Sequence, residues 1–260
     1  MVVRLSGPLL GTGTAITAIN RIVAVMVMCT IMTYAKSIML YERAFSCAGL
    51  LNTTSTQPGV RLAQYVLHSD GSHYEKRGKG DPACIDDEIP FEIPESWAWV
   101  RLGDIGDWKA GATPAKGESK YYSNGAIPWL LTGDLTDGPV TEIPNTITEQ
   151  ALRECSVRLN PVGSVLVAMY GATIGKIGVL GVAATTNQAC CACVLHDESI
   201  RGWLVTWLRY QKPHFIKMGE GGAQPNISRQ KIVGCLLPLP PLEEQRRIVD
   251  SCKALLSVLG

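Results

Sequence analysis

The stretch from Gly171 to Lys176, with the sequence GATIGK, is the first in this chain whose residue types and spacing suggest chemistry. It is similar to a phosphate-binding loop, in which four residues separate two glycines and a Ser or Thr follows the lysine. Here three residues separate the glycines and Ile177 follows the lysine, so the spacing argues against a nucleotide-hydrolysing site. The glycines, Lys176 and the neighbouring Tyr170 instead suit an anionic polymer, since backbone amides and lysine can meet phosphates.

A second candidate for chemistry is the cluster of Cys190, Cys191 and Cys193, which with His196 could ligate zinc. No second cluster completes a tetrahedral ligand set, and the apolar surroundings favour buried cysteines in a strand. The acid, acid, lysine pattern of metal-dependent nucleases is matched only superficially, by residues of a polar loop. The sequence therefore predicts no catalytic residue and no metal site, and indicates recognition without chemistry.

Three polar segments remain as candidates for binding nucleic acid. The first is the loop over 109–121, which combines cations, hydroxyls and an aromatic ring with little apolar content, as a phosphate-contacting loop would. A merely solvated loop has the same composition, and this alternative stays open. The candidate contacts of this loop are Lys109, Thr113, Lys116, Ser119, Lys120 and Tyr121.

The second segment is a hairpin predicted over 164–180, because branched apolar residues flank glycines that a tight connection needs. Its tip offers Tyr170, Thr173 and Lys176, although the glycines could serve turn geometry alone. The third segment is the Gly-rich loop over 219–229, whose amide, hydroxyl and guanidinium groups can read base edges. Its candidate contacts are Gln224, Asn226, Ser228 and Arg229.

The length, hydrophobic content, net charge and cysteine count of the chain limit the kinds of protein that it can be. Its 260 residues, 46% of them hydrophobic, can bury a proper core, which argues against disorder for most of the chain. A net charge of +1 does not indicate a nucleic-acid partner by itself, so any such surface must be local. The 9 cysteines are odd in number and irregularly spaced, which makes a poor disulfide framework and favours reduced thiols in the cytoplasm.

Composition divides the chain into three parts. Residues 1–85 are an N-terminal extension of unassigned fold and a solvated linker that ends at residue 82. The apolar run 22–35 in this extension is shorter than a membrane-spanning helix, and export by a signal peptide is the weaker alternative. Residues 86–240 form the main domain, in which Trp97 and Trp99 are expected to pack in the core.

The third part, residues 241–260, begins a helix after a run of prolines and places carboxylates in its first turn, where the helix dipole favours them. Apolar residues recur along it at spacings of four, three and four, which gives one face able to pair with another helix. We expect this face to dock on a partner helix or on its own domain. It consists of Ile248, Cys252, Leu255 and Leu259.

Seven short motifs occur in a fixed order between residues 93 and 245. They read IPESW (93–97), GATP (111–114), GAIPW (125–129), YGATIGK (170–176), TNQA (186–189), QPNIS (224–228) and LPPLEEQ (239–245). Any one of them is weak, but together they run through more than half of the chain. From about residue 86 onward the chain resembles the specificity subunit of type I restriction-modification systems, over one target recognition domain and the beginning of the helix that follows it.

The resemblance implies a mixed α/β fold, with a twisted, mostly β target recognition domain, flanking helices and the start of a coiled-coil helix. It implies a non-catalytic subunit that binds half of a split target in double-stranded DNA and directs methylation and cleavage by partners. The implied partners are a modification (methyltransferase) subunit and a restriction subunit, on which S-adenosylmethionine, ATP and Mg are expected. No cofactor and no membrane contact is expected for this chain.

The chain departs from the family pattern in having one recognition domain rather than two and a helix that stops at Gly260. It would then act as a half-subunit that forms a homodimer, or be a truncated product. The alternative function is a protein-interaction module that retains only partner docking through the helix face.

Overall fold

The computed structural model describes residues 63–67, 71–94, 96–220 and 225–259. The first 62 residues, with the apolar run 22–35, and Gln224 lie outside the described residues. Along the described chain, strands alternate with helices and short 3-10 turns, which confirms the predicted mixed α/β class. None of the helices in these residues is long and apolar enough to cross a membrane.

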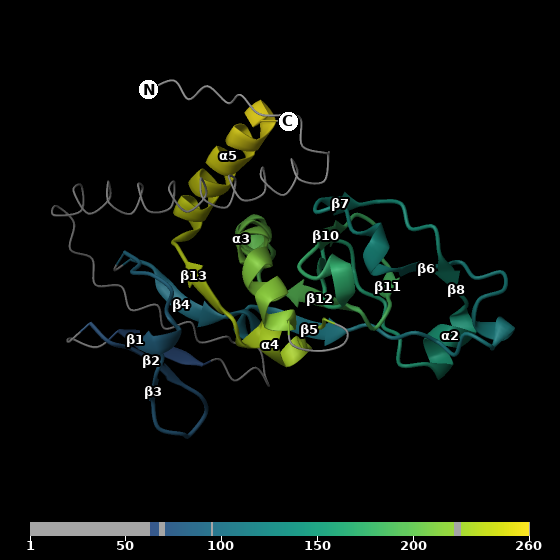
Figure 1. The fold of residues 1–260 in the computed structure, drawn as a ribbon, viewed down its shortest axis with the longest axis horizontal. Coiled ribbons are helices and arrows are strands. Elements are labelled where there is room, and N and C mark those ends of the chain that lie inside the picture. The colour runs from purple at the N-terminus through teal and green to yellow at the C-terminus, as the bar shows by residue number, and fades with distance from the viewer. Residues whose placement is uncertain (1–62, 68–70, 95, 221–224, 260) are drawn as a thin grey trace.

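A five-stranded sheet in the order β5-β12-β9-β10-β7 forms the centre of the molecule (Figure 1). Its neighbours pair antiparallel except for β7, which is parallel to β10. β9 is buried at every position, because its alternate residues enter two different apolar cores on the two faces of the sheet. The strands are β5 (Gly106–Ala110), β7 (Pro139–Val140), β9 (Val165–Ala168), β10 (Ile177–Leu180) and β12 (Cys190–Leu195).

The hairpin predicted over 164–180 is confirmed, since β9 and β10 pair antiparallel with Ile177 opposite Val167. A 3-10 turn at Gly171–Thr173 connects them. Gly171 and Gly175 have φ angles of 62° and 75°, a left-handed backbone that glycine adopts without strain. These two glycines are therefore explained by turn geometry.

A smaller three-stranded sheet and a short helix surround a separate apolar core at one end of the molecule (Figure 1). Trp129 and Ile147 are buried there, together with Ala151 of the helix. The helix begins after Thr148, whose hydroxyl accepts a hydrogen bond from the Ala151 N–H at 3.2 Å. The elements are β6 (Ile127–Leu130), β8 (Thr146–Ile147), β11 (Thr185–Thr186) and α2 (Glu149–Glu154).

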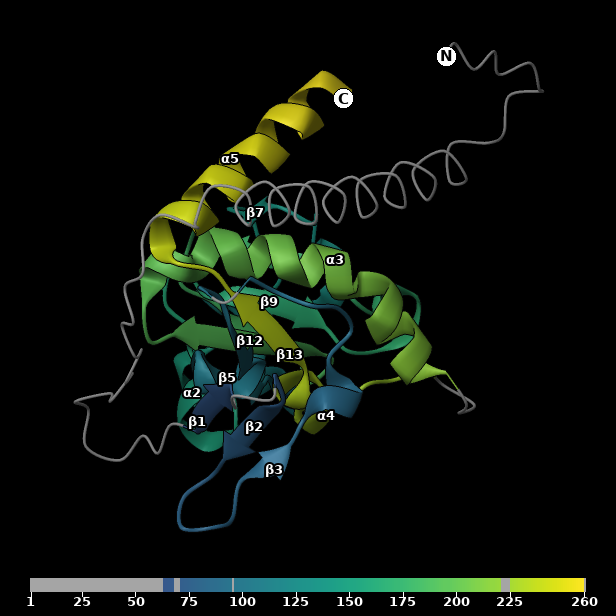
Figure 2. The ribbon, with the colours of Figure 1, turned by 90° about the vertical axis from the view of Figure 1, so that its left-hand side faces the viewer.

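The largest core lies between the central sheet, the strand pair β4 and β13, and the helices that Figure 2 shows beside them. The rings of Trp97 and Trp203 meet edge to face with centroids 5.9 Å apart, and those of Trp99 and Trp207 are 6.4 Å apart. The predicted core position of Trp97 and Trp99 is thus confirmed. The elements are β4 (Ala98–Arg101), α3 (Arg201–Gly219), α4 (Arg229–Gly234), β13 (Leu236–Leu239) and α5 (Leu242–Leu259).

The apolar face of α5 packs against α3 of its own domain. Ile248 and Cys252 are 1% and 5% exposed and belong to the largest core. The interpretation of these two residues as a face for a partner helix is therefore wrong, because the area that a partner would bury is already buried. Leu255 is half-buried, and the side chain of Leu259 lies outside the described residues.

A three-stranded sheet precedes residue 86, where the sequence predicts a linker. Tyr65 donates a hydrogen bond to Asp104 and accepts one from the Arg101 N–H at 2.8 Å. Buried Glu75 forms an ion pair with Arg101 at 2.9 Å. The linker prediction is wrong for residues 64–67 and 73–76, which form strands, whereas residues 77–82 form an exposed loop. The strands are β1 (Gln64–Leu67), β2 (His73–Lys76) and β3 (Ala83–Cys84).

Candidate nucleic-acid interface

Four segments of the chain meet at one edge of the central sheet. β5 and β9 end at this edge, and β12 begins there because it is antiparallel to both. The segment before α4 joins them through an antiparallel bridge between Tyr170 and Asn226. We call the four segments together the loop edge; they are residues 111–114, 169–176, 187–189 and 225–229.

Backbone hydrogen bonds fasten the segments of the loop edge to their neighbours. The bonds between different parts of the chain include Ala112 N to Thr186 O (3.0 Å), Met169 N to Ala189 O (2.8 Å) and Gly171 N to Pro225 O (2.9 Å). A Cβ atom at Gly111 would overlap with the carbonyl oxygens of Thr186 and Asn187, so this close approach requires glycine. The loop edge is therefore held by backbone hydrogen bonds together with its buried side chains Met169, Ile174 and Ile227, which lie in the largest core.

The hairpin tip contributes three predicted contacts to the loop edge, and they are not equivalent. Tyr170 is 43% exposed, and no hydrogen bond engages its hydroxyl within the described residues. Thr173 donates its hydroxyl to the Tyr170 carbonyl at 2.8 Å, so this group serves the turn. Lys176 is half-buried and forms no ion pair with the described residues. Tyr170 and Lys176 thus remain available to a ligand.

α4 brings Arg229 beside the end of β5. The Ser228 hydroxyl accepts a hydrogen bond from the Lys231 N–H at 3.2 Å, which caps the helix and occupies the hydroxyl. Arg229 Nη1 donates to the Trp108 carbonyl at 3.4 Å, which places the guanidinium close to exposed Lys109. Among the described residues, no ion pair includes Lys109 or Arg229. These two cations can therefore meet phosphates without first losing a carboxylate.

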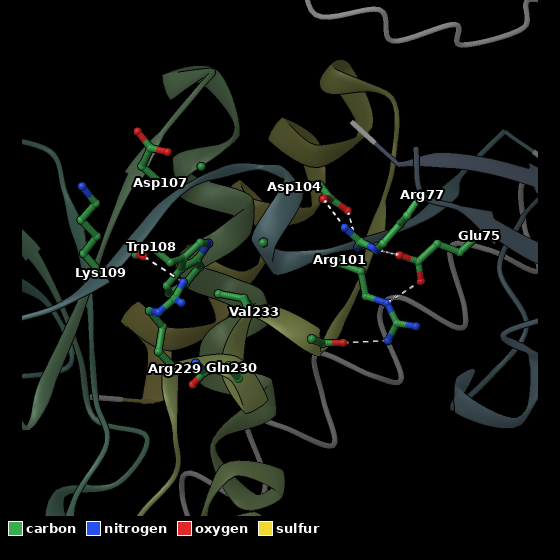
Figure 3. A pocket seen from close by; sticks show the side chains of 13 residues that line it. Glu75, Arg77, Arg101, Asp104, Asp107, Trp108, Lys109, Arg229, Gln230 and Val233 are labelled. Carbon is green, nitrogen blue, oxygen red and sulfur yellow. Dashed lines mark hydrogen bonds and ion pairs between the residues drawn. The ribbon is translucent and has the colours of Figure 1, made fainter. Parts of the chain in front are cut away.

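Lys109 and Arg229 line one side of an open depression of about 710 Å³. Figure 3 shows Arg77, Glu75 and Asp104 on its opposite side. On that side the charge of Arg77 is neutralised, because Arg77 forms ion pairs with Glu75 and, at 3.1 Å, with Asp104. Burial lowers the pKa of Arg77, but the hydrogen bond and the charge of Asp104 together outweigh this effect, so the pKa is raised. The two cations without a carboxylate partner among the described residues thus lie on the Lys109 side of the depression, which also carries the exposed carboxylate of Asp107.

The later part of the predicted polar loop turns away from the loop edge toward α2 (Figure 1). Lys120 Nζ lies 3.1 Å from the Glu154 carboxylate, and the Tyr121 hydroxyl donates to the same oxygen at 3.1 Å. The hydrogen bond to Glu154 raises the pKa of Lys120. Lys116 and Ser119 are exposed in the same segment. Of the six candidates in this loop, only Lys109 and Thr113 lie at or beside the loop edge.

Gln188 is a loop-edge residue that composition alone does not select. Its side chain is exposed, and its Oε1 accepts a hydrogen bond from the Thr113 hydroxyl. The residue precedes Ala189, which is bonded to Met169 of the hairpin. A sequence signal for it exists, because residues 185–188 interrupt an otherwise apolar stretch with polar side chains.

The cysteines of β12 are buried and do not converge on a ligand site. Cys190 enters the core on one face of the sheet, whereas Cys191 and Cys193 enter the core on the other. Burial raises the pKa of Cys191 to about 12, so its thiol stays protonated. The expectation of buried strand cysteines is confirmed. Within the part of the chain that the structure describes, no three His, Cys, Asp or Glu side chains gather so that they could hold a metal ion.

The family model for the type I restriction modification DNA specificity domain matches residues 94–258. The type I restriction enzyme EcoR124I/EcoR124II specificity subunit of Escherichia coli is 28% identical over 157 residues, 58% of this chain and 39% of that protein. The type I restriction enzyme MjaIX specificity subunit of Methanocaldococcus jannaschii is 30% identical over 162 residues, 60% of this chain and 37% of that protein. The chain thus spans about two fifths of the length of these curated relatives.

Comparison with solved structures also finds proteins of type I restriction-modification systems. A chain from a study of complex assembly and conformational transition of the type I R-M system superposes with a TM-score of 0.52 at 28% identity, over 65% of this chain and 40% of that chain. The HsdS subunit from Thermoanaerobacter tengcongensis superposes with a TM-score of 0.50 at 27% identity, over 65% of this chain and 39% of that chain. Sequence and fold therefore point to one family.

Proposed function

This chain belongs to the family of type I restriction modification DNA specificity domains, and we propose that it binds double-stranded DNA in a sequence-specific manner. In this proposal the chain supplies recognition and carries out no catalytic step. It reads half of a split target and so directs methylation and cleavage by other subunits.

The observation that carries the proposal is the loop edge itself. Four segments far apart in the sequence present amide, hydroxyl and aromatic groups at one edge, beside Lys109 and Arg229, which form no ion pair with the residues that the structure describes. Cations that meet phosphates fix the register of a protein on DNA, and polar side chains beside them can read base edges. This combination supports a DNA surface on a chain whose net charge is only +1.

The relatives are specificity subunits of type I restriction enzymes, which supports partners of two kinds. We propose that a modification (methyltransferase) subunit and a restriction subunit assemble with this chain in the cytoplasm. S-adenosylmethionine, ATP and Mg would then be bound by those subunits and not by this chain. A homodimer of half-subunits would supply the second recognition domain.

The alternative, a module that only docks a partner through the apolar face of α5, has less support. Ile248 and Cys252 of that face are already buried against α3. A partner would have to use other surface on α5 or on another element.

The proposal is tested by titrating the full chain against a fluorescent pool of random-sequence duplexes at several salt concentrations, alone and with a modification subunit present. The logarithm of the binding constant should fall linearly with the logarithm of salt concentration, because each phosphate contact releases counterions. A selected duplex should then bind more tightly than the pool. Binding that ignores salt, or that never distinguishes one sequence from another, contradicts the proposal.

A further inference from the structure

A small part of the fold lies before residue 94, where the match to the family model begins, and projects from the domain. Strands β2 and β3 pair antiparallel, with Tyr74 opposite Cys84, and the exposed loop 77–82 connects them. Figures 1 and 2 both show this loop extending beyond the other described elements, on the side away from α5. We call β2, β3 and the loop between them the arm.

The base of the arm is fastened to the domain by ion pairs. The buried carboxylate of Glu75 in β2 pairs with Arg101 of β4 at 2.9 Å. Arg77, at the start of the loop, pairs with Asp104 at 3.1 Å. Separating a buried charge from its partner is costly, so these contacts hold the arm in one orientation.

The tip of the arm is a tight turn that presents one lysine. The Gly80 N–H donates to the Arg77 carbonyl at 3.2 Å, which closes the turn over residues 77–80. Gly78 has a φ of 60°, which glycine adopts without strain. Lys79 lies between the two glycines, is exposed, and forms no ion pair with the described residues. The turn therefore holds this ammonium away from the domain.

The arm and the loop edge stand on two sides of the same depression. Arg77 at the base of the arm lines one side, whereas Lys109 and Arg229 line the other (Figure 3). Arg77 is already paired, so it offers little to a phosphate. Lys76 is half-buried on the opposite face of β2 from Glu75, because side chains alternate along a strand. Lys79 is therefore the cation of the arm that is available to a ligand.

Duplex DNA fits the tip of the arm better than a protein partner does. The loop 77–82 has no large apolar side chain, whereas protein interfaces are built around buried aromatic or aliphatic anchors. The glycines beside Lys79 let a ligand approach the backbone closely, and a phosphate requires only a cation there. Since the arm is held rigidly at its base, less entropy is lost when its lysine binds.

We propose that the arm is a second DNA contact, in which Lys79 binds a backbone phosphate outside the stretch that the loop edge covers. The inference rests on the proposed DNA-binding function and adds to it a contact that lies before the residues of the family match. Phosphates carry no base identity, so the arm lengthens the bound stretch and strengthens binding without changing the preferred sequence.

The test compares the unaltered full chain with three variants in titrations against the random-sequence duplex pool over a salt series. K79A should bind about threefold more weakly, with a salt slope smaller by about 1, because one phosphate contact is lost. K79R keeps the charge and should bind within about twofold of the unaltered chain. D81N removes the exposed carboxylate two residues from Lys79 and should bind more tightly, by up to about twofold.

The matched control is K253A, which removes the same charge from an exposed lysine of α5, on the side of the molecule away from the arm (Figure 1). It should bind DNA as the unaltered chain does. Hydroxyl-radical footprinting on one tightly bound duplex gives a second measurement. K79A should shorten the protected stretch at one end only and leave its middle unchanged.

The outcomes separate this inference from the function on which it rests. If K79A binds and protects DNA as the unaltered chain does, or if K253A loses as much affinity as K79A, the arm contact is overturned and DNA recognition stands. A K79A chain that keeps its DNA affinity but binds a modification subunit more weakly also overturns it, and assigns the arm to a protein partner. A chain that binds no duplex at all overturns the proposed function and this inference with it.

Discussion

The loop edge and the polar segment 115–121 have similar side chains, but the fold uses their charges differently. At the loop edge, Arg229 donates only to a backbone carbonyl, and Lys109 beside it forms no ion pair with the described residues. In the segment 115–121, Lys120 is paired with Glu154 of α2. A cation that already has a carboxylate gains less from a phosphate, because the first pair must be broken. The absence of a carboxylate partner is therefore a better guide to the candidate interface than the number of Lys and Arg residues in a segment.

The largest expected effect comes from replacing one glycine in each region, Gly111 of the loop edge and Gly117 of the polar segment. G111A should destabilise the protein by about 3 kcal/mol, because the new methyl group would overlap with backbone oxygens that cannot easily move. G117A, in the polar segment, should be neutral or stabilising by about 0.5 kcal/mol, because a Cβ there meets nothing within 4 Å. Chemical denaturation of both variants measures the two values. Equal stabilities would show that the loop edge is not held tightly by its backbone.

Charge removal gives the next largest effect. The double variant K109A/R229A should bind duplex DNA roughly tenfold more weakly, and its salt slope should be smaller by about 2, one unit for each lost phosphate contact. The variant K120A should bind within twofold of the unaltered chain, because its ammonium is held by Glu154. Fluorescence anisotropy over a salt series measures both. A larger loss for K120A than for the double variant would reverse the assignment of the two regions.

The smallest expected effect is on the pKa of Glu154, the carboxylate that pairs with Lys120 of the polar segment. The hydrogen bond from Gln150, and then the one from Lys120, lower the pKa of Glu154 below its ordinary value of 4.5. The stabilising contribution of this carboxylate is therefore complete above about pH 4.5 and is lost as the pH falls through the lowered pKa. Carboxyl NMR should show the pKa of Glu154 rising toward 4.5 in Q150A and less so in K120A. An unchanged pKa in both variants would show that these two hydrogen bonds do not lower the pKa of Glu154.

Some features of the fold could be predicted from local sequence patterns alone. The hairpin over 164–180 follows from branched residues around glycines, and the core positions of Trp97 and Trp99 follow from ring size. Both depend on near neighbours in the chain, and both are confirmed.

The errors arose where contacts distant in sequence decide the outcome. Lys120 is paired 34 residues away, and the strand residue Glu75 is paired with Arg101, 26 residues away, so neither the loop nor the linker could be judged from composition. The face of Ile248 and Cys252 has the correct helical period, but the period does not say whether α3 or a partner covers it. Gln188 was missed for the same reason, because only the fold brings it beside Thr113 and the hairpin.

The backbone bonds of the loop edge have a consequence for which of its positions accept substitutions. The N–H and C=O groups of residues 112, 169 and 171 and of their partners hold the edge, and every residue except proline has both groups. The exposed side chains at positions 170, 188 and 226 can therefore be exchanged without removing these backbone bonds. A library randomised at these three positions should therefore remain folded, so that any loss of DNA binding in it reports on the lost side chains and not on a lost fold.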